Sequence, residues 1–69
     1  MTIEDVSNLL YEKVNKFYWF VAIGIGKISE KDVLYLYVNS TKDLERDFPE
    51  RILDGFPIII QTTSRPRPA

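Results

Sequence analysis

The stretch WFVAIGIG at residues 19–26 and the stretch VLYLYV at residues 33–38 decide the fold of this chain. Both are short apolar runs rich in aromatic and β-branched residues, which is typical of β-strands. The residues between them, 27–32, are mostly charged or polar, so the two runs are predicted to pair as an antiparallel hairpin. Apolar side chains would then lie on both faces of the hairpin, and each face would need a cover.

Alternation along the hairpin divides its side chains into two sets. The first set is mostly aliphatic and is expected to face the helices: Trp19, Val21, Ile23, Ile25, Leu34, Leu36 and Val38. The second set, rich in tyrosine and glycine, is expected on the opposite face: Tyr18, Phe20, Ala22, Gly24, Gly26, Val33, Tyr35 and Tyr37. Glycine in a strand allows a close approach, so Gly24 or Gly26 leaves room for the ring of Tyr35 or Tyr37.

An amphipathic helix is predicted before the hairpin. Thr2 is a suitable N-cap, and acidic residues follow it in the first turn. Apolar residues then recur at spacings of three and four and form one stripe: Ile3, Val6, Leu10, Val14 and Phe17. We expect this stripe to pack the helix onto the sheet.

The second half of the chain is predicted to add a short helix and a third strand. Residues 40–43 offer a helix start, Pro49 is expected to begin a separate helical turn, and Gly55 to end it. The β-branched run at residues 56–63 follows as the strand. Its alternate residues are expected in the core (Phe56, Ile58, Ile60) and on the tyrosine-rich face (Ile59, Gln61, Thr63).

The predicted fold class is therefore α+β. We expect a small two-layer sandwich in the order helix, strand, strand, short helix, strand, with a three-stranded sheet and both helices on one face. Residues 1–64 would form a single domain, and residues 65–69 an extended or disordered tail. Which strand lies at the centre is left open.

Composition excludes several kinds of chemistry. The 69-residue chain has no Cys and no His, so it cannot form disulfides, a thiolate or imidazole zinc site, or a Ser-His or Cys-His catalytic pair. We therefore expect no enzyme activity, no cofactor and no metal site. The formal net charge is −1, without the basic excess that phosphate-backbone binding usually requires. No run is apolar enough to span a membrane, and a cytoplasmic protein is expected.

Several landmarks resemble a short accessory domain that precedes the protease domain in some trypsin-like proteins of bacteria and plants. The residues that carry the resemblance are Gly24-Ile25-Gly26, the run at 33–38, Phe48-Pro49 and Gly55-Phe56-Pro57-Ile58, within residues 21–64. The glycine that this family places after the third strand is missing, because Thr62-Thr63-Ser64 stands there. The resemblance implies an accessory module and carries no protease activity.

The functional prediction is a non-enzymatic interaction module. The apolar second face and the small core suggest self-association through the aromatic face or through an edge strand, giving a homo-oligomer, or binding to another protein. The predicted partner-binding residues are Tyr18, Phe20, Tyr35, Tyr37 and Ile59. Coverage of this face by the tail or loops is one alternative. The other is a single-stranded nucleic-acid-binding domain, in which the aromatics stack bases and Lys27, Lys31, Arg65 and Arg67 contact phosphates.

Overall fold

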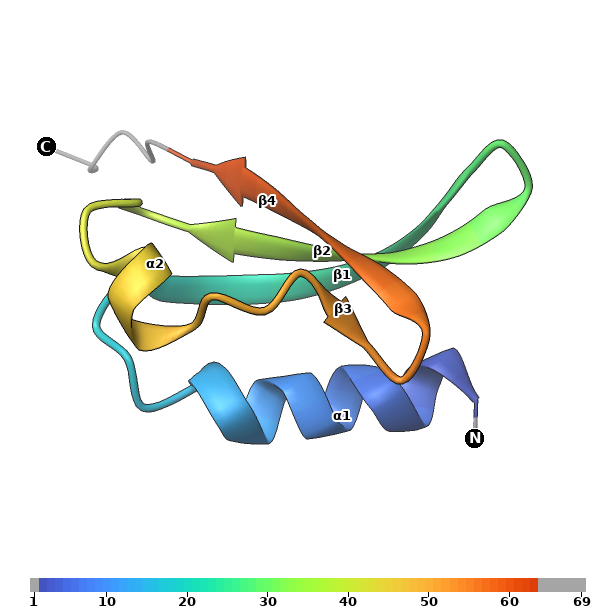
Figure 1. Ribbon diagram of the computed structural model, residues 1–69, viewed down its shortest axis with the longest axis horizontal. Helices are drawn as coiled ribbons and strands as arrows, with labels where there is room; N and C mark the ends of the chain where they lie inside the picture. Colours follow the sequence, from blue (N-terminus) through green and yellow to red (C-terminus); the bar gives the residue numbers. More distant parts are fainter. Residues whose placement is uncertain (1, 64–69) are drawn as a thin grey trace, which may run out of the picture.

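The computed structural model describes residues 2–63, which fold into two helices and a four-stranded mixed sheet (Figure 1). The elements are α1 (Ile3–Val14), β1 (Phe20–Ile28), β2 (Lys31–Val38), α2 (Leu44–Asp47), β3 (Ile52–Leu53) and β4 (Phe56–Thr62). The strand order is β1-β2-β4-β3, in which β2 pairs antiparallel with β1 and parallel with β4. The α+β class is confirmed. The predicted tail at residues 65–69, and the end of the predicted domain at residue 64, lie outside the described residues.

The predicted three-stranded sheet is wrong, because β3 forms a fourth strand. No helical turn begins at Pro49: α2 ends at Asp47, and its C-cap Phe48 adopts an extended conformation, as the residue before a proline usually does. The chain continues into β3, which pairs antiparallel with the start of β4. Gly55 does have a positive φ, of 85°, but it forms the tight β3–β4 turn with Asp54 at 51° instead of ending a helix.

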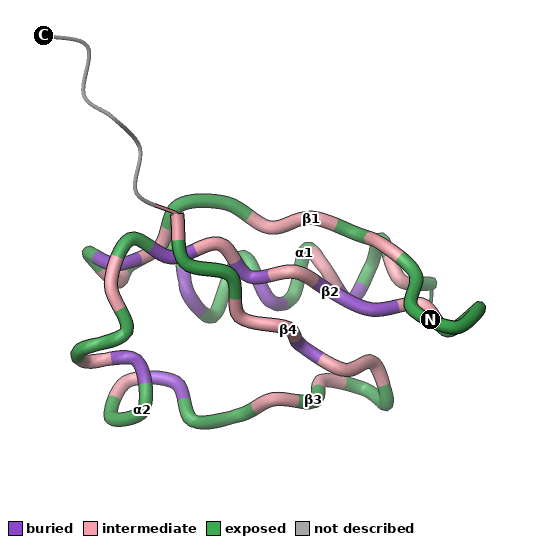
Figure 2. Tube along the Cα trace, turned by 90° about the horizontal axis from the view of Figure 1, so that it is seen from above, coloured by how far each residue is buried: buried purple, intermediate pink, exposed green. Residues whose placement is uncertain are grey.

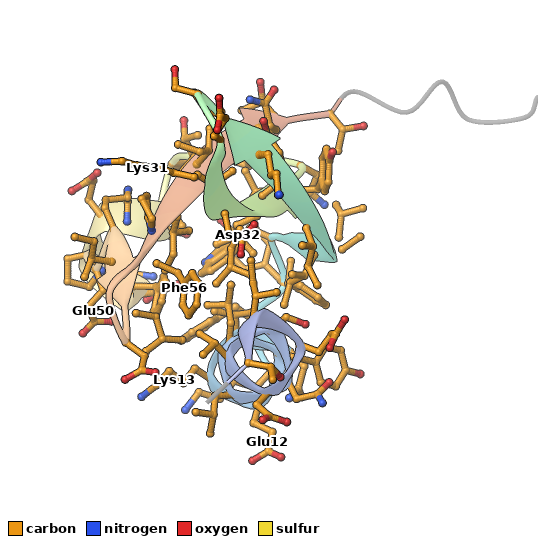
Figure 3. All side chains as sticks on the ribbon, turned by 90° about the vertical axis from the view of Figure 1, so that its right-hand side faces the viewer. Glu12, Lys13, Lys31, Asp32, Glu50 and Phe56 are labelled. Atoms are coloured by element: carbon orange, nitrogen blue, oxygen red, sulfur yellow. The ribbon has the colours of Figure 1, made fainter. Side chains whose placement is uncertain are left out.

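The helix α1 follows its sequence pattern. Its N-terminus is a capping box, in which the Asp5 backbone N–H donates to Thr2 Oγ1 at 3.2 Å and the Thr2 N–H donates to Asp5 Oδ2 at 3.3 Å. Val6, Leu10 and Val14 are fully buried on the stripe that faces the sheet. Figure 3 shows the charged side chains of Glu12 and Lys13 on the outer side of the helix.

One core holds both helices against a single face of the sheet. Its fully buried members come from α1, from β2 and from Trp19, while Leu44 of α2 and the adjacent Phe48 close one end. Figure 2 shows buried residues recurring along β2, the strand next to both β1 and β4. Ile58 is buried in this core and Ile60 packs against it, as predicted for β4. Figure 3 shows Phe56 pointing into the layer between the sheet and α1.

A β-bulge near the start of β1 overturns part of the predicted alternation. Phe20 pairs with Val38, but the next pair is Ala22 with Tyr37, so Val21 is an extra residue. Phe20 consequently turns toward the core, where its ring meets Tyr11 of α1 edge to face at 5.6 Å. The predictions that Phe20 lies on the tyrosine-rich face and that Val21 lies in the core are both wrong.

The β1–β2 hairpin is longer than predicted, because both strands continue through the charged segment. Ile28 pairs with Lys31, which leaves only Ser29 and Glu30 in the turn. Both residues have positive φ, at 51° and 66°, as a two-residue turn of type I′ requires. The tight turn preserves the twist of a ribbon whose end projects beyond the rest of the sheet (Figure 1).

Candidate functional site

The face of the sheet opposite α1 carries a continuous apolar surface, which we call the tyrosine face. Strand register places Gly24, Tyr35 and Ile59 side by side across β1, β2 and β4. Adjacent rows complete the set, which comprises Ala22, Gly24, Gly26, Ile28, Lys31, Val33, Tyr35, Tyr37, Ile59 and Gln61. Lys31 is the one charged residue among these members.

The two tyrosine rings lie flat over the glycines of β1. A methyl group placed on Gly26 would fall 2.5 Å from Tyr35 Cε2, and one on Gly24 would fall 3.2 Å from Tyr37 Cε2. The ring centroids are 6.4 Å apart, with planes inclined by 31°. The predicted packing of tyrosines over glycines is therefore confirmed, and it makes this part of the face broad and level.

Burial on the tyrosine face rises toward its central strand. Val33 of β2 is only 3% exposed although it points away from α1, and Tyr35, Tyr37 and Ile59 are half-buried. Among the described residues, both helices belong to the core on the other side of the sheet. The tyrosine face therefore combines well-ordered apolar side chains with accessible ring surface.

The structure brings together three of the five residues predicted to bind a partner. Tyr35 and Ile59 are register partners, and Tyr37 is the next residue along the same face of β2. Phe20 is turned into the core by the bulge. Tyr18 precedes β1, is exposed and points toward the α2 region, so it does not join the tyrosine face.

A polar cluster ties the segment before β1 to α2. The Tyr18 hydroxyl donates to Asp43 Oδ2 at 2.5 Å, and the Trp19 indole Nε1–H donates to Asp47 Oδ2 at 3.0 Å. Arg46 lies between the two carboxylates, 3.1 Å from Asp47 Oδ1 and 3.5 Å from Asp43 Oδ1. Sequence reasoning missed these contacts, because residues so far apart in the chain are brought together only by the tertiary fold.

The hydrogen bonds in this cluster perturb its titrating groups. The pKa of Asp47 lies below its usual value, first because the Trp19 N–H stabilises the carboxylate and second because Arg46 does so as well. The pKa of Tyr18 is raised, chiefly because its hydroxyl donates to the Asp43 carboxylate. Trp19 is fully buried and stacks on Phe17 at 4.9 Å, so the cluster anchors a core residue at the end of the sheet.

A shallow groove separates α1 from the outer edge of β1. Ser7, Asn8 and Tyr11 line its helical side, and residues 20–23 line its strand side. Polar and apolar groups are mixed in this groove, and the bulge at Val21 interrupts the strand edge. The tyrosine face is therefore the more coherent surface for binding.

The described part of the chain offers no obvious centre for metal chemistry or membrane insertion. Within residues 2–63, no group of three or more His, Cys, Asp or Glu side chains is arranged to hold a metal ion. Neither α1 nor α2 has the length and apolar character needed to cross a membrane.

Comparison with known proteins adds no relative to these observations. No protein-family model matches the sequence, and no match was found among curated proteins or solved structures. The resemblance to accessory domains of trypsin-like proteins stays a prediction.

Proposed function

We propose that this chain is a non-enzymatic interaction module that self-associates through the tyrosine face. The observation that carries the proposal is the row Gly24, Tyr35 and Ile59, beside which the rings of Tyr35 and Tyr37 lie level over β1. Tyrosine and other aromatic residues are enriched at protein interfaces, where they contribute large contact areas with few rotatable bonds.

The physical reason is the lack of water-soluble side chains at the centre of this face. An antiparallel or mixed sheet in a two-layer domain normally covers one face with helices and exposes a polar face on the other side. Here the second face exposes tyrosine, isoleucine and valine instead. Packing this surface against another apolar surface removes it from water, which is the dominant favourable contribution to most protein association.

A second copy of the chain is a suitable partner because the tyrosine face is nearly uncharged. Two-fold packing places each residue against a residue of the same face, so a charged patch would meet charge of the same sign. Lys31 lies at the hairpin end of the face, away from Tyr37 and Gln61. Two sheets can therefore stack through their centres without bringing like charges together.

The test is the solution mass over a range of protein concentrations, measured by light scattering and sedimentation equilibrium. The wild-type chain should pass from monomer to dimer as its concentration rises. Ile59→Lys should shift this equilibrium strongly toward the monomer, because a charge at the centre of the face would have to be buried. The matched control is Ile52→Lys on β3, where the isoleucine is 62% exposed and lies outside the tyrosine face.

Two outcomes would contradict self-association through this face. The first is a monomer at every accessible concentration, with the mass unchanged by Tyr35→Ser and Tyr37→Ser. The second is a dimer that Ile52→Lys disrupts as strongly as Ile59→Lys, since the contact would then lie elsewhere. Circular dichroism should first show that each variant retains the fold.

The level tyrosine rings also favour a second candidate function, stacking of single-stranded nucleic-acid bases. Lys31 supplies a positive charge at the end of the face, and the candidate phosphate contacts Arg65 and Arg67 lie outside the described residues. This function predicts a rise in fluorescence polarisation of labelled oligonucleotides that disappears with added salt. Its absence at low salt would remove this candidate and leave self-association unaffected.

A further inference from the structure

The end of the β1–β2 hairpin differs from the rest of the sheet. β4 pairs with β2 only from Leu34 onward, so residues 26–33 form a ribbon of two strands, which we call the hairpin arm. Figure 1 shows the arm leading away from α1 at one end of the molecule. The described helices therefore leave the outermost part of the arm without a cover.

The hairpin arm carries an exposed isoleucine on the tyrosine face. Ile28 pairs with Lys31 and is 46% exposed. Ile25, at the base of the arm, is 47% exposed but pairs with the core residue Leu34 and points to the opposite face. These two isoleucines have the same chemistry and the same exposure, and they differ in the face they occupy.

The opposite end of β1 also exposes apolar side chains. The bulge leaves Val21 and Ala22 between the core-facing residues Phe20 and Ile23, and both remain accessible. Val21 is 36% exposed. β1 therefore has one uncovered apolar position at each end, with Gly24 and Gly26 beneath the tyrosine rings between them.

The area of the central tyrosine face is small for a stable interface. Three strands about 4.8 Å apart and a shared length of about 17 Å give a level patch of roughly 240 Å². Specific interfaces usually remove about 800 Å² of accessible surface from each partner. The two-stranded arm extends the patch by roughly half, as judged from the same spacings. A dimer that uses the arm has a contact large enough for weak, reversible association.

We propose that the hairpin arm clasps a second copy of the chain, with Ile28 packing on Val21 and Ala22 of that copy. This inference rests on the proposed function. A two-fold axis that crosses β2 near Tyr35 and runs perpendicular to the strands reverses the strand direction in the second copy. Each arm then lies over the start of the other copy's β1, and the two uncovered ends of that strand cover each other reciprocally.

The experiment compares Ile28→Lys with Ile25→Lys by sedimentation equilibrium. Burial of a large aliphatic side chain in each half of the dimer predicts that Ile28→Lys raises the dimer dissociation constant by about tenfold or more. Ile25→Lys should leave the constant within about twofold of wild type, which is a small change in free energy. Both isoleucines are exposed at their ends, and urea denaturation at low concentration checks that both variants fold.

A second measurement uses the absence of native cysteine. The double variant Ala22→Cys, Ile28→Cys should give a covalent dimer with a short bismaleimide, and Ala22→Cys, Ile25→Cys should give much less. If Ile59→Lys dissociates the dimer while Ile28→Lys has no more effect than Ile25→Lys, the arm is excluded and the tyrosine-face dimer stands. If the wild-type chain is always monomeric, both proposals fail.

Discussion

The ring of Tyr35 lies across Gly26 so closely that a methyl group on Gly26 would fall 2.5 Å from Cε2 of the ring. Gly26→Ala should therefore force the ring away from β1 and lower the free energy of unfolding by about 1–2 kcal/mol, as overpacking does. Gly24→Ala is the milder control, since its nearest ring atom is 3.2 Å away.

A double-mutant cycle separates this contact from the intrinsic preference of the strand. In a Tyr35→Ala background the clash is gone, and Gly26→Ala should become neutral or stabilising by about 0.5–1 kcal/mol, because glycine is unfavourable inside strands. Urea denaturation measures all four proteins. An equal cost of Gly26→Ala in both backgrounds would show that the ring does not depend on the glycine.

The turn between β1 and β2 offers a stabilising substitution. Ser29 and Glu30 both hold positive φ, which disfavours residues that carry a Cβ. Replacing the pair by Asn-Gly should raise the free energy of unfolding by about 1 kcal/mol, because this pair suits the same turn. Thermal and urea denaturation would measure the gain. A loss of stability would mean that Ser29 or Glu30 makes a contact that outweighs the backbone cost.

The Trp19–Asp47 hydrogen bond predicts part of the acid sensitivity of the fold. The folded-state pKa of Asp47 is lowered by the Trp19 N–H and then by Arg46, so folding favours its carboxylate. This contribution is present above the ordinary carboxyl pKa of about 4 and is lost as the pH falls through the lower folded-state value. Between about pH 5 and pH 2, the wild type should lose more stability than Asp47→Asn.

Fluorescence of the single tryptophan measures this pH dependence directly during urea denaturation. Arg46→Gln removes the second cause of the shift and should give an intermediate slope. Equal slopes for the wild type and Asp47→Asn would show that Asp47 does not couple protonation to folding. Glu12→Gln on the outer side of α1 is a matched control for loss of one carboxylate.

Neighbouring isoleucines on β4 distinguish the core from the tyrosine face. Ile58 is buried against the helices, so Ile58→Ala should cost about 2–5 kcal/mol of stability at any protein concentration. Ile59 lies on the tyrosine face, so Ile59→Ala should cost less in dilute solution and more as dimers form. Denaturation at two concentrations tests this. A concentration-independent cost for Ile59 would place its contribution within the monomer.

Periodicity predicted the main elements because burial repeats regularly along them. The α1 stripe, the alternation of β2 and the inward direction of Ile58 all follow from side chains that need one apolar side. The pairing of Tyr35 with Gly26 was also accessible from sequence, because glycine in a strand signals a close approach.

The errors arose where one residue changes the phase or where a turn has two meanings. The bulge at Val21 reversed the expected faces of Phe20 and Val21, and an inserted residue leaves no mark in the apolar pattern. Gly55 after Asp54 suits both a helix end and a tight hairpin, and only the pairing of Leu53 with Phe56 decides between them. The Tyr18–Asp43 contact joins positions 25 residues apart, which local patterns do not predict.

The parallel pairing of β2 with β4 has a consequence for how the chain folds. β1 reaches β2 through a two-residue turn, whereas β4 reaches it only after the segment from Asn39 to Gly55 has closed. Loop closure makes such non-local pairing slower, so we expect the hairpin to form before β4 docks. During that interval one edge of β2 carries unpaired amides beside exposed tyrosines, and the partly folded chain is at its most prone to aggregate. Refolding yield should therefore fall as the concentration of the chain rises.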